Sequence, residues 1–249
     1  MKKLMFGMAV AAAGLAFGLE SANVVGYDQT GLRFGSKGAG ASFVPVNGAT
    51  AINMQDIKVV GYDVEEGTEG DVTAQTLDQF GRDTATYEWY DVVDGEDVYY
   101  GWYDSDFELV EDLTVLPGEG FYVRAPDTSY KFQSAGQVPV ADIAVQLRFG
   151  SKLVVNPTPV TLDFQATWIT GYDDEEGTEG DVTAQTLDQF GRDTATYEWY
   201  DVVDGEDVYY GWYDSNFELV ENLTLMPGES LYVRAPDTSY YMNFPGVTL

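Results

Sequence analysis

Carboxylate side chains are concentrated in one short stretch that occurs twice in the chain. Residues 63–71 read DVEEGTEGD and residues 173–181 read DDEEGTEGD. Because Ca²⁺ takes oxygen ligands from acidic loops of this kind, the stretch predicts a candidate calcium site, the one cofactor that the sequence suggests. Its ligands would come from Asp63, Glu65, Glu66, Glu69 and Asp71, and from Asp173, Glu175, Glu176, Glu179 and Asp181.

The alternative for this stretch is a pair of solvated acidic loops. Neither copy has the DxDxDG order of a helix-loop-helix calcium site. Val64 stands in one copy where Asp174 stands in the other, which argues against a metal ligand at that position. Both interpretations stay open on the sequence alone.

Glycoside hydrolases also use a pair of carboxylates as catalytic residues, one acting as acid and the other as nucleophile or base. No spacing in this chain singles out such a pair. The chain has no histidine and no cysteine, which excludes Ser-His-Asp triads, thiolate nucleophiles and metal sites that need histidine. The sequence therefore predicts no enzyme, and a glycan-active hydrolase is the most remote of three hypotheses.

Aromatic side chains crowd two predicted strands that follow the acidic stretch, residues 84–93 and 98–104. Side chains alternate between the two faces of a strand, so Tyr90, Tyr99 and Tyr103 share one face and the tryptophans share the other. Exposed aromatic rings beside carboxylates suit stacking on sugars. The candidate carbohydrate-binding residues are Trp89, Tyr90, Tyr99, Trp102 and Tyr103, with their copies Trp199, Tyr200, Tyr209, Trp212 and Tyr213; the alternative is tyrosines that cover a sheet or pack between units.

The chain is strongly acidic, with 42 Asp and Glu against 12 Lys and Arg and a formal net charge of −30. A surface this negative repels phosphate backbones and anionic lipids. We therefore expect no nucleic acid partner, and the remaining candidates are divalent cations, basic proteins and neutral glycans.

Residues 65–105 recur unchanged as residues 175–215. Residues 61–130 and 171–240 differ at seven positions of seventy, and the element LRFGSK occurs at both 32–37 and 147–152. The chain therefore predicts two tandem units, residues 22–138 and 139–249. The exchanges Val115/Leu225, Leu116/Met226 and Phe121/Leu231 are apolar in both copies and predict core positions, whereas Gly120/Ser230 indicates that this position does not need a positive φ.

Short runs of aromatic and β-branched residues, separated by Gly, Pro and Asp, predict strands almost throughout. Asp94-Gly95-Glu96-Asp97 predicts a hairpin loop and Pro117-Gly118 a type II turn. Residues 71–80 are ambiguous, and their threonines favour a strand over a short helix. Residues 41–46 are expected to open the first unit with another strand. The predicted fold class is all-β, with two small sandwich-like or barrel-like modules.

The first 21 residues have the composition of a secretory signal peptide. Lys2 and Lys3 precede the apolar run 4–17, and small residues allow cleavage after about residue 18 or 22. The run is shorter than the roughly 20 residues of a membrane helix, and no other segment qualifies. We expect an exported bacterial protein, secreted or at the cell surface, with no membrane span in its mature chain.

The order of several short motifs resembles small β-modules of exported and cell-surface bacterial proteins. These motifs are Val154-Val155-Asn156-Pro157, Gly171-Tyr172-Asp173, Gly211-Trp212-Tyr213-Asp214 and Leu225-Met226-Pro227-Gly228, followed by Leu231-Tyr232-Val233. They are similar to a family pattern of the type NLIS-P, YD, W, L-PG-GYWV. The start Ser21-Ala22-Asn23-Val24 also resembles short exported repeat proteins of unknown function from planctomycete-related bacteria. The resemblance implies an extracellular accessory or structural role and no catalytic residues.

The leading hypothesis is a non-enzymatic, exported β-repeat protein with a structural, adhesive or assembly role that presents two near-identical surfaces. Two tethered copies of one surface gain avidity when both can engage. The alternative is a tandem carbohydrate-binding module. The expected partners are an extracellular glycan or an envelope protein, with self-association through exposed edge strands as a further route.

Overall fold

The computed structural model describes residues 25–32, 35–40, 51–62, 67–172, 177–187 and 192–248. Within them the regular elements are β-strands and two short 3₁₀ helices. The predicted all-β class is confirmed. The predicted signal peptide and the strand expected at residues 41–46 lie outside the described residues.

The first unit contains an antiparallel five-stranded sheet in the order β2-β9-β5-β6-β7. Its strands are β2 (Gly35–Gly40), β9 (Gly120–Ala125), β5 (Thr68–Leu77), β6 (Asp83–Asp94) and β7 (Asp97–Tyr103). A smaller sheet in the order β1-β10-β4 is built from β1 (Val25–Gly31), β10 (Lys131–Gln137) and β4 (Lys58–Val60). A two-stranded ribbon and the 3₁₀ turn beside it are formed by β3 (Ile52–Asn53), β8 (Thr114–Val115) and η1 (Met54–Asp56).

The second unit repeats this arrangement. Its five-stranded sheet runs β12-β19-β15-β16-β17, with β12 (Gly150–Val155), β19 (Ser230–Ala235), β15 (Thr178–Leu187), β16 (Asp193–Asp204) and β17 (Asp207–Tyr213). The smaller sheet contains β11 (Ile143–Gln146), β20 (Tyr241–Phe244) and β14 (Trp168–Thr170). The ribbon and turn are β13 (Leu162–Asp163), β18 (Thr224–Leu225) and η2 (Phe164–Ala166).

Each unit has its own hydrophobic core. One cluster of buried side chains draws on residues 32–132 and the other on residues 145–244. In the first, Trp102 of the large sheet packs edge-on against Phe132 of the small sheet, with ring centroids 5.8 Å apart. In the second, Trp212 stacks on Phe164 at 4.7 Å. The large sheet thus packs face to face on the smaller elements, as in a small β-sandwich.

Local predictions can be compared with these elements. The ambiguous residues 71–80 lie mostly in strand β5, as preferred. Residues 94–97 close the β6–β7 hairpin, and Gly118 has the positive φ, 83°, of a Pro-Gly turn. The core prediction was right for Val115/Leu225 and Phe121/Leu231 but wrong for Leu116 and Met226, which are 49% and 52% exposed. Those two side chains point outward because side chains alternate along an extended chain and the preceding Val115 and Leu225 point into the core.

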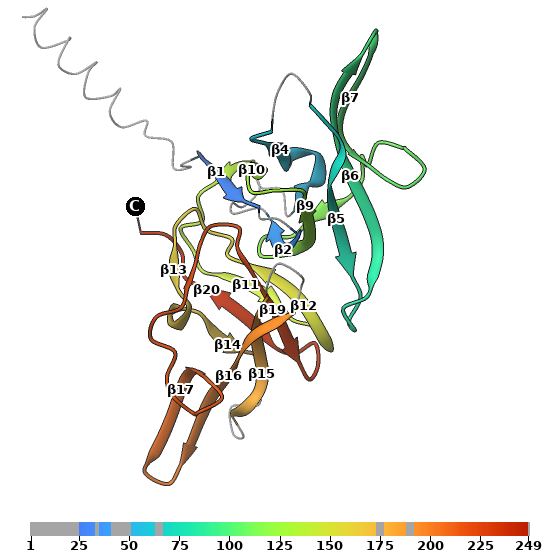
Figure 1. Cartoon of the computed structure of the whole chain (residues 1–249). Coiled ribbons are helices and arrows are strands. Elements are labelled where there is room, and N and C mark those ends of the chain that lie inside the picture. Colours follow the sequence, from blue (N-terminus) through green and yellow to red (C-terminus); the bar gives the residue numbers. More distant parts are fainter. Residues whose placement is uncertain are drawn as a thin grey trace, which may run out of the picture.

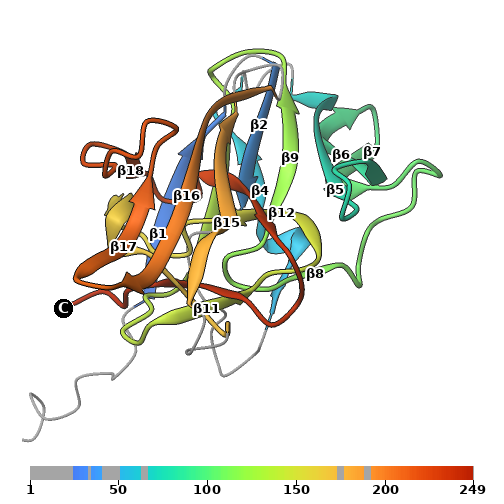
Figure 2. The ribbon, with the colours of Figure 1, turned by 90° about the horizontal axis from the view of Figure 1, so that it is seen from below.

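The β6–β7 and β16–β17 hairpins project from opposite sides of the molecule (Figure 1), and the view turned by 90° agrees (Figure 2). Between them, the Pro-Gly turn of each unit lies against strand β2 or β12 of the other. We call this region of contact the seam. It holds the two hairpins facing away from each other.

Candidate functional site

The tryptophans of the aromatic hairpin are core residues. Trp102 and Trp212 are fully buried, and Trp89 and Trp199 are 5% and 7% exposed. The indole Nε1 of Trp102 donates a hydrogen bond to the carbonyl of Ile57 at 2.6 Å. The prediction that Trp89, Trp102, Trp199 and Trp212 bind ligand was therefore wrong, because the base of the hairpin lies over the small sheet and its tryptophan face is covered there.

The opposite face of the same hairpin carries a group of rings, which we call the aromatic cluster; its tyrosines are half-buried and its phenylalanine is exposed. In the first unit it consists of Tyr90, Tyr99, Tyr103 and Phe107. Phe107 stacks on Tyr103 with centroids 4.8 Å apart and an interplanar angle of 18°, and it meets Tyr90 and Tyr99 edge-on at 5.0 and 5.2 Å. The second unit repeats this geometry closely with Tyr200, Tyr209, Tyr213 and Phe217. The prediction that the three tyrosines share one face is confirmed.

Phe107 completes the cluster from a strained backbone conformation. Its φ is 61°, and that of Phe217 is 59°; these are the only non-glycine residues with positive φ in the described part of the chain. The turn is held by Asp104, whose carboxylate accepts hydrogen bonds from the N–H groups of Asp106 and Glu108 at 3.0 and 2.9 Å. A left-handed phenylalanine costs roughly 1–2 kcal/mol. Strain kept in both copies at an exposed ring is typical of functional surfaces.

Sequence reasoning missed Phe107 and Phe217. The run Asp104-Ser105-Asp106 is a turn signal, but the left-handed position of such a turn normally holds Gly or Asn. Nothing in the pattern shows that a phenylalanine takes this position and returns its ring onto the hairpin.

A glycine in β5 makes room for the cluster. Gly70 has φ 82° and lies at a register shift between β5 and β6. A Cβ atom there would lie 2.9 Å from the hydroxyl oxygen of Tyr90. That hydroxyl donates to Glu88 Oε2 at 3.0 Å, and burial, followed by the bond to Glu88, raises the pKa of Tyr90. The phenol is therefore a neutral donor at the edge of the cluster.

Side chains around the cluster extend its apolar surface. Phe107 and Leu109 are 46% and 41% exposed, and Tyr103 and Leu109 form a β-bridge. On the other face of the protruding tip, Val93, Val98 and Tyr100 are exposed as well, Tyr100 to 58%. Asp94, Glu96 and Asp97 surround the tip with negative charge. The hairpin is an apolar, aromatic surface with an acidic border, suited to binding by burial and stacking.

The acidic stretch is described only in part. Asp63, Glu65, Glu66, Asp173, Glu175 and Glu176 lie outside the described residues. Glu69 and Asp71 line a hollow of about 410 Å³ with Tyr62, Asp127 and Tyr130, and the Tyr130 hydroxyl donates to Asp71 Oδ2 at 3.1 Å. In the second unit Tyr240 donates to Asp181 at 3.4 Å; Glu179 pairs with Tyr200 across β15 and β16. Within the described ranges, no group of three or more acidic side chains is arranged to hold a metal ion.

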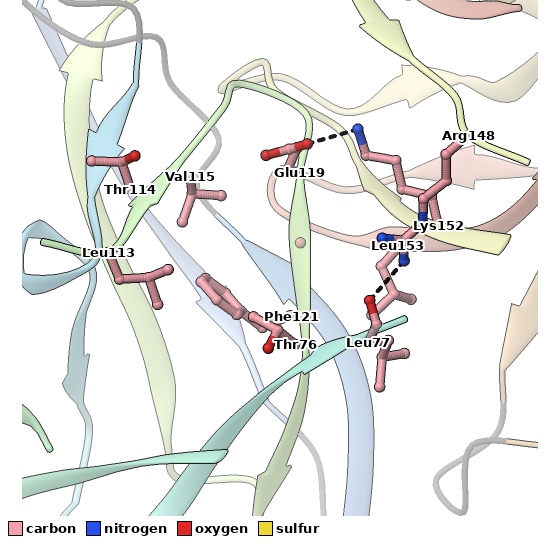
Figure 3. Close-up of a pocket in the computed structure, with 11 residues that line it drawn as sticks. Thr76, Leu77, Leu113, Thr114, Val115, Glu119, Phe121, Arg148, Lys152 and Leu153 are labelled. Atoms are coloured by element: carbon pink, nitrogen blue, oxygen red, sulfur yellow. Dashed lines mark hydrogen bonds and ion pairs between the residues drawn. The ribbon is translucent and has the colours of Figure 1, made fainter. Parts of the chain in front are cut away.

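A second hollow lies at the seam, with a volume of about 150 Å³ (Figure 3). Arg148 Nη2 donates to the carbonyl of Leu77 at 2.7 Å, and Lys152 Nζ lies 2.7 Å from Glu119 Oε1. Both bonds cross from one unit to the other, so these cations are occupied in joining the units. A ligand role for this hollow is not indicated.

Comparison of the chain with protein-family models, with curated proteins and with solved structures gave no match in any of the three. In the part of the chain that the structure describes, no helix has the length and hydrophobicity to cross a membrane.

Proposed function

We propose that this chain is an exported, non-enzymatic two-site binding protein, with an adhesive or assembly role in a bacterial envelope or extracellular structure. The sites are the two aromatic clusters together with the hairpin tips. The observation that carries the proposal is their orientation, because the two equivalent hairpins project from opposite sides of the molecule (Figure 1). Two binding surfaces that face away from each other are better placed to bind two separate partners than to bind the same partner together.

The composition of the hairpins supports the same role. Monomeric proteins rarely leave a contiguous patch of large apolar side chains open unless it binds something. On the face of the aromatic cluster, Phe107 and Leu109 remain more than 40% exposed in the first unit, and Phe217 and Leu219 do so in the second. Export is proposed from the signal-peptide composition of residues 1–21 and would be tested by mass spectrometry of the secreted chain.

The experiment separates binding from bridging. Beads coated with the envelope fraction of the producing cells are mixed with the parent protein, with Phe107→Ala, and with Phe107→Ala/Phe217→Ala. The single variant should bind the beads but no longer aggregate them, because one working site cannot bridge. The double variant should do neither. Phe80→Ala, which removes an aromatic ring that is 62% exposed outside the clusters, is the matched control. Full aggregation by the double variant would refute the proposal.

Carbohydrate binding is the alternative, and one observation favours it. Tyr100 is 58% exposed on a sheet face, directly across from Asp91, and Tyr210 and Asp201 repeat the pair. A ring beside a carboxylate acceptor suits a sugar. Pull-down on insoluble polysaccharides should then fail for Tyr100→Ala/Tyr210→Ala. Absence of binding by the parent protein would eliminate this alternative.

A further inference from the structure

The contacts at the seam are reciprocal. Ala39 of β2 forms a β-bridge with Glu229, and Val154 of β12 forms the equivalent bridge with Glu119. Likewise the Gly40 N–H donates to the Gly228 carbonyl at 3.3 Å, and the Val155 N–H donates to the Gly118 carbonyl at 2.9 Å. Each unit therefore offers the same strand and the same turn to the other. Such an interface is self-complementary, like that of a two-fold dimer.

The side chains at the centre of the seam are not reciprocal. The second unit has Val155 and Ser230 where the first has Gly40 and Gly120. A Cβ atom on Gly120 would lie 2.7 Å from Val155 Cγ1. A Cβ atom on Gly40 would lie 2.7 Å from the carbonyl oxygen of Glu119 and 3.2 Å from the same methyl group. Val155 is fully buried. Its side chain thus fills the space that the two glycines leave open.

This asymmetry explains the exchange of Gly120 for Ser230. Position 120 faces Val155, so any side chain there collides with a β-branched residue that has little rotamer freedom. By the reciprocity of the seam, position 230 stands opposite Gly40, the first-unit equivalent of Val155, which has no side chain to collide with the serine. Neither Gly40 nor Gly120 has a positive φ, so conformation is not the reason for either glycine.

We propose that Val155, set against Gly40 and Gly120, makes the seam selective, so that the first unit accepts the second unit and neither accepts a copy of itself. Two second units would place valine against valine and serine, which overpacks the centre. Two first units would place glycine against glycine and leave a void. The partner that fits the first unit is therefore a surface with the β12 sequence. Because of this selectivity the two units of one chain contact each other at the seam, and the two hairpins project away from it.

A double-mutant cycle in the full chain tests the proposal. Gly120→Ala should lower the melting temperature by roughly 5 °C and speed hydrogen exchange at the Gly40 and Val155 amides, which lie outside the identical stretches. In a Val155→Ala background the same change should cost almost nothing, because the colliding methyl group is gone. Ser230→Ala is the matched control and should not lower the melting temperature. If Gly120→Ala lowers the melting temperature as much in the Val155→Ala background as in the parent chain, or if both variants that carry it fail to fold, the proposal is overturned.

A reciprocal swap tests selectivity directly. Gly40→Val/Gly120→Ser turns the first unit into a second-type surface, and Val155→Gly/Ser230→Gly does the converse. Each pair alone should melt several degrees below the parent, because the seam becomes homotypic. All four changes together restore a valine facing two glycines, with the sides exchanged, and should melt above both pairs. A four-fold variant that melts below both pairs would show that the sequence differences do not encode selectivity.

Discussion

At the scale of single residues, Phe107 and Phe217 combine a strained backbone with an exposed ring. The strain is local, because the turn around each is closed by hydrogen bonds of the Asp104 or Asp214 carboxylate. These hydrogen bonds lower the pKa of Asp214, and the bond from the Glu218 N–H makes the largest contribution. The turn therefore stays formed at neutral pH and presents the ring.

In a left-handed backbone conformation a glycine variant should be more stable than an alanine variant, which is the reverse of the usual order of stability. Phe107→Ala and Phe107→Gly both remove the ring, but only glycine also removes the strain. We expect the glycine variant to be more stable than the alanine variant by about 1 kcal/mol, measured by urea unfolding. At Val98, an ordinary strand position in β7, alanine should be the more stable of the two. Equal stabilities at position 107 would contradict the left-handed turn.

Two aspartates of the second unit predict opposite responses to acid. Burial raises the pKa of Asp201. Hydrogen bonds from the Ser239 hydroxyl and backbone lower the pKa of Asp237. The stabilising contribution of Asp201 is therefore complete below its unfolded pKa and lost as the pH rises through its folded pKa. That of Asp237 is complete above its unfolded pKa and lost as the pH falls through its folded pKa.

Neutral substitutions test these signs. At pH 7, Asp201→Asn should melt above the parent protein because the buried charge is gone, whereas Asp237→Asn should melt below it. Both differences should shrink towards about pH 3, where the parent carboxyls take up protons. Melting curves at the two pH values provide the measurement. A constant difference for Asp201→Asn would show that its effect does not come from ionisation.

At the scale of elements, the hairpin is fixed to the 3₁₀ turn beside it. Gln55 of η1 donates through Nε2 to the carbonyls of Trp102 and Val110, at 2.9 and 3.0 Å, and its Oε1 accepts from the Trp102 N–H at 3.1 Å. A Cβ on Gly101 would collide with this amide. In the second unit Gln165 bonds the carbonyl and N–H of Trp212 in the same way. One polar side chain thus anchors the base of each projecting hairpin.

Removal of this anchor should loosen the hairpin. Gln55→Leu removes the side-chain partner of the Trp102 N–H and of the Val110 carbonyl, while the Trp102 carbonyl keeps the Val110 N–H. We therefore expect a loss of about 2 kcal/mol in urea unfolding. Gln165→Leu should cost a similar amount. Gln29→Leu, at an exposed position of β1, is the control and should be nearly neutral. If Gln55→Leu is equally neutral, the hairpin does not depend on η1.

The strands could be predicted from sequence because aromatic and β-branched residues alternate in them, and the face shared by Tyr90, Tyr99 and Tyr103 followed from that alternation. The burial of Trp89 and Trp102 could not be predicted, because alternation separates two faces without showing which one lies over another sheet. The same limit applies to Leu116, an apolar residue beside a two-residue strand. The place of Phe107 in the aromatic cluster could not be predicted, because it depends on a positive φ that phenylalanine disfavours.

At the scale of the whole molecule, two separate cores are joined by a polar and well-packed seam. The expectation of two independent modules has a direct test. Trp212→Ala creates a large cavity in the second core and should cost about 3–5 kcal/mol there, while the first core keeps all its residues. Unfolding should then occur in two steps. Hydrogen exchange can monitor each step separately, because the peptide that contains Phe121 and the peptide that contains Leu231 differ in mass. A single shifted transition would show instead that the units fold as one.

The identity of residues 65–105 and 175–215, taken with the glycines that face Val155, limits how the gene can change. A crossover within the repeated stretch would delete one copy and join the front of the first unit to the back of the second. The shortened product would keep Gly40 and Ser230 but lose β12 with Val155. Its strand β2 would have no matching surface to cover it, so selection for solubility would act against such deletions and preserve the tandem.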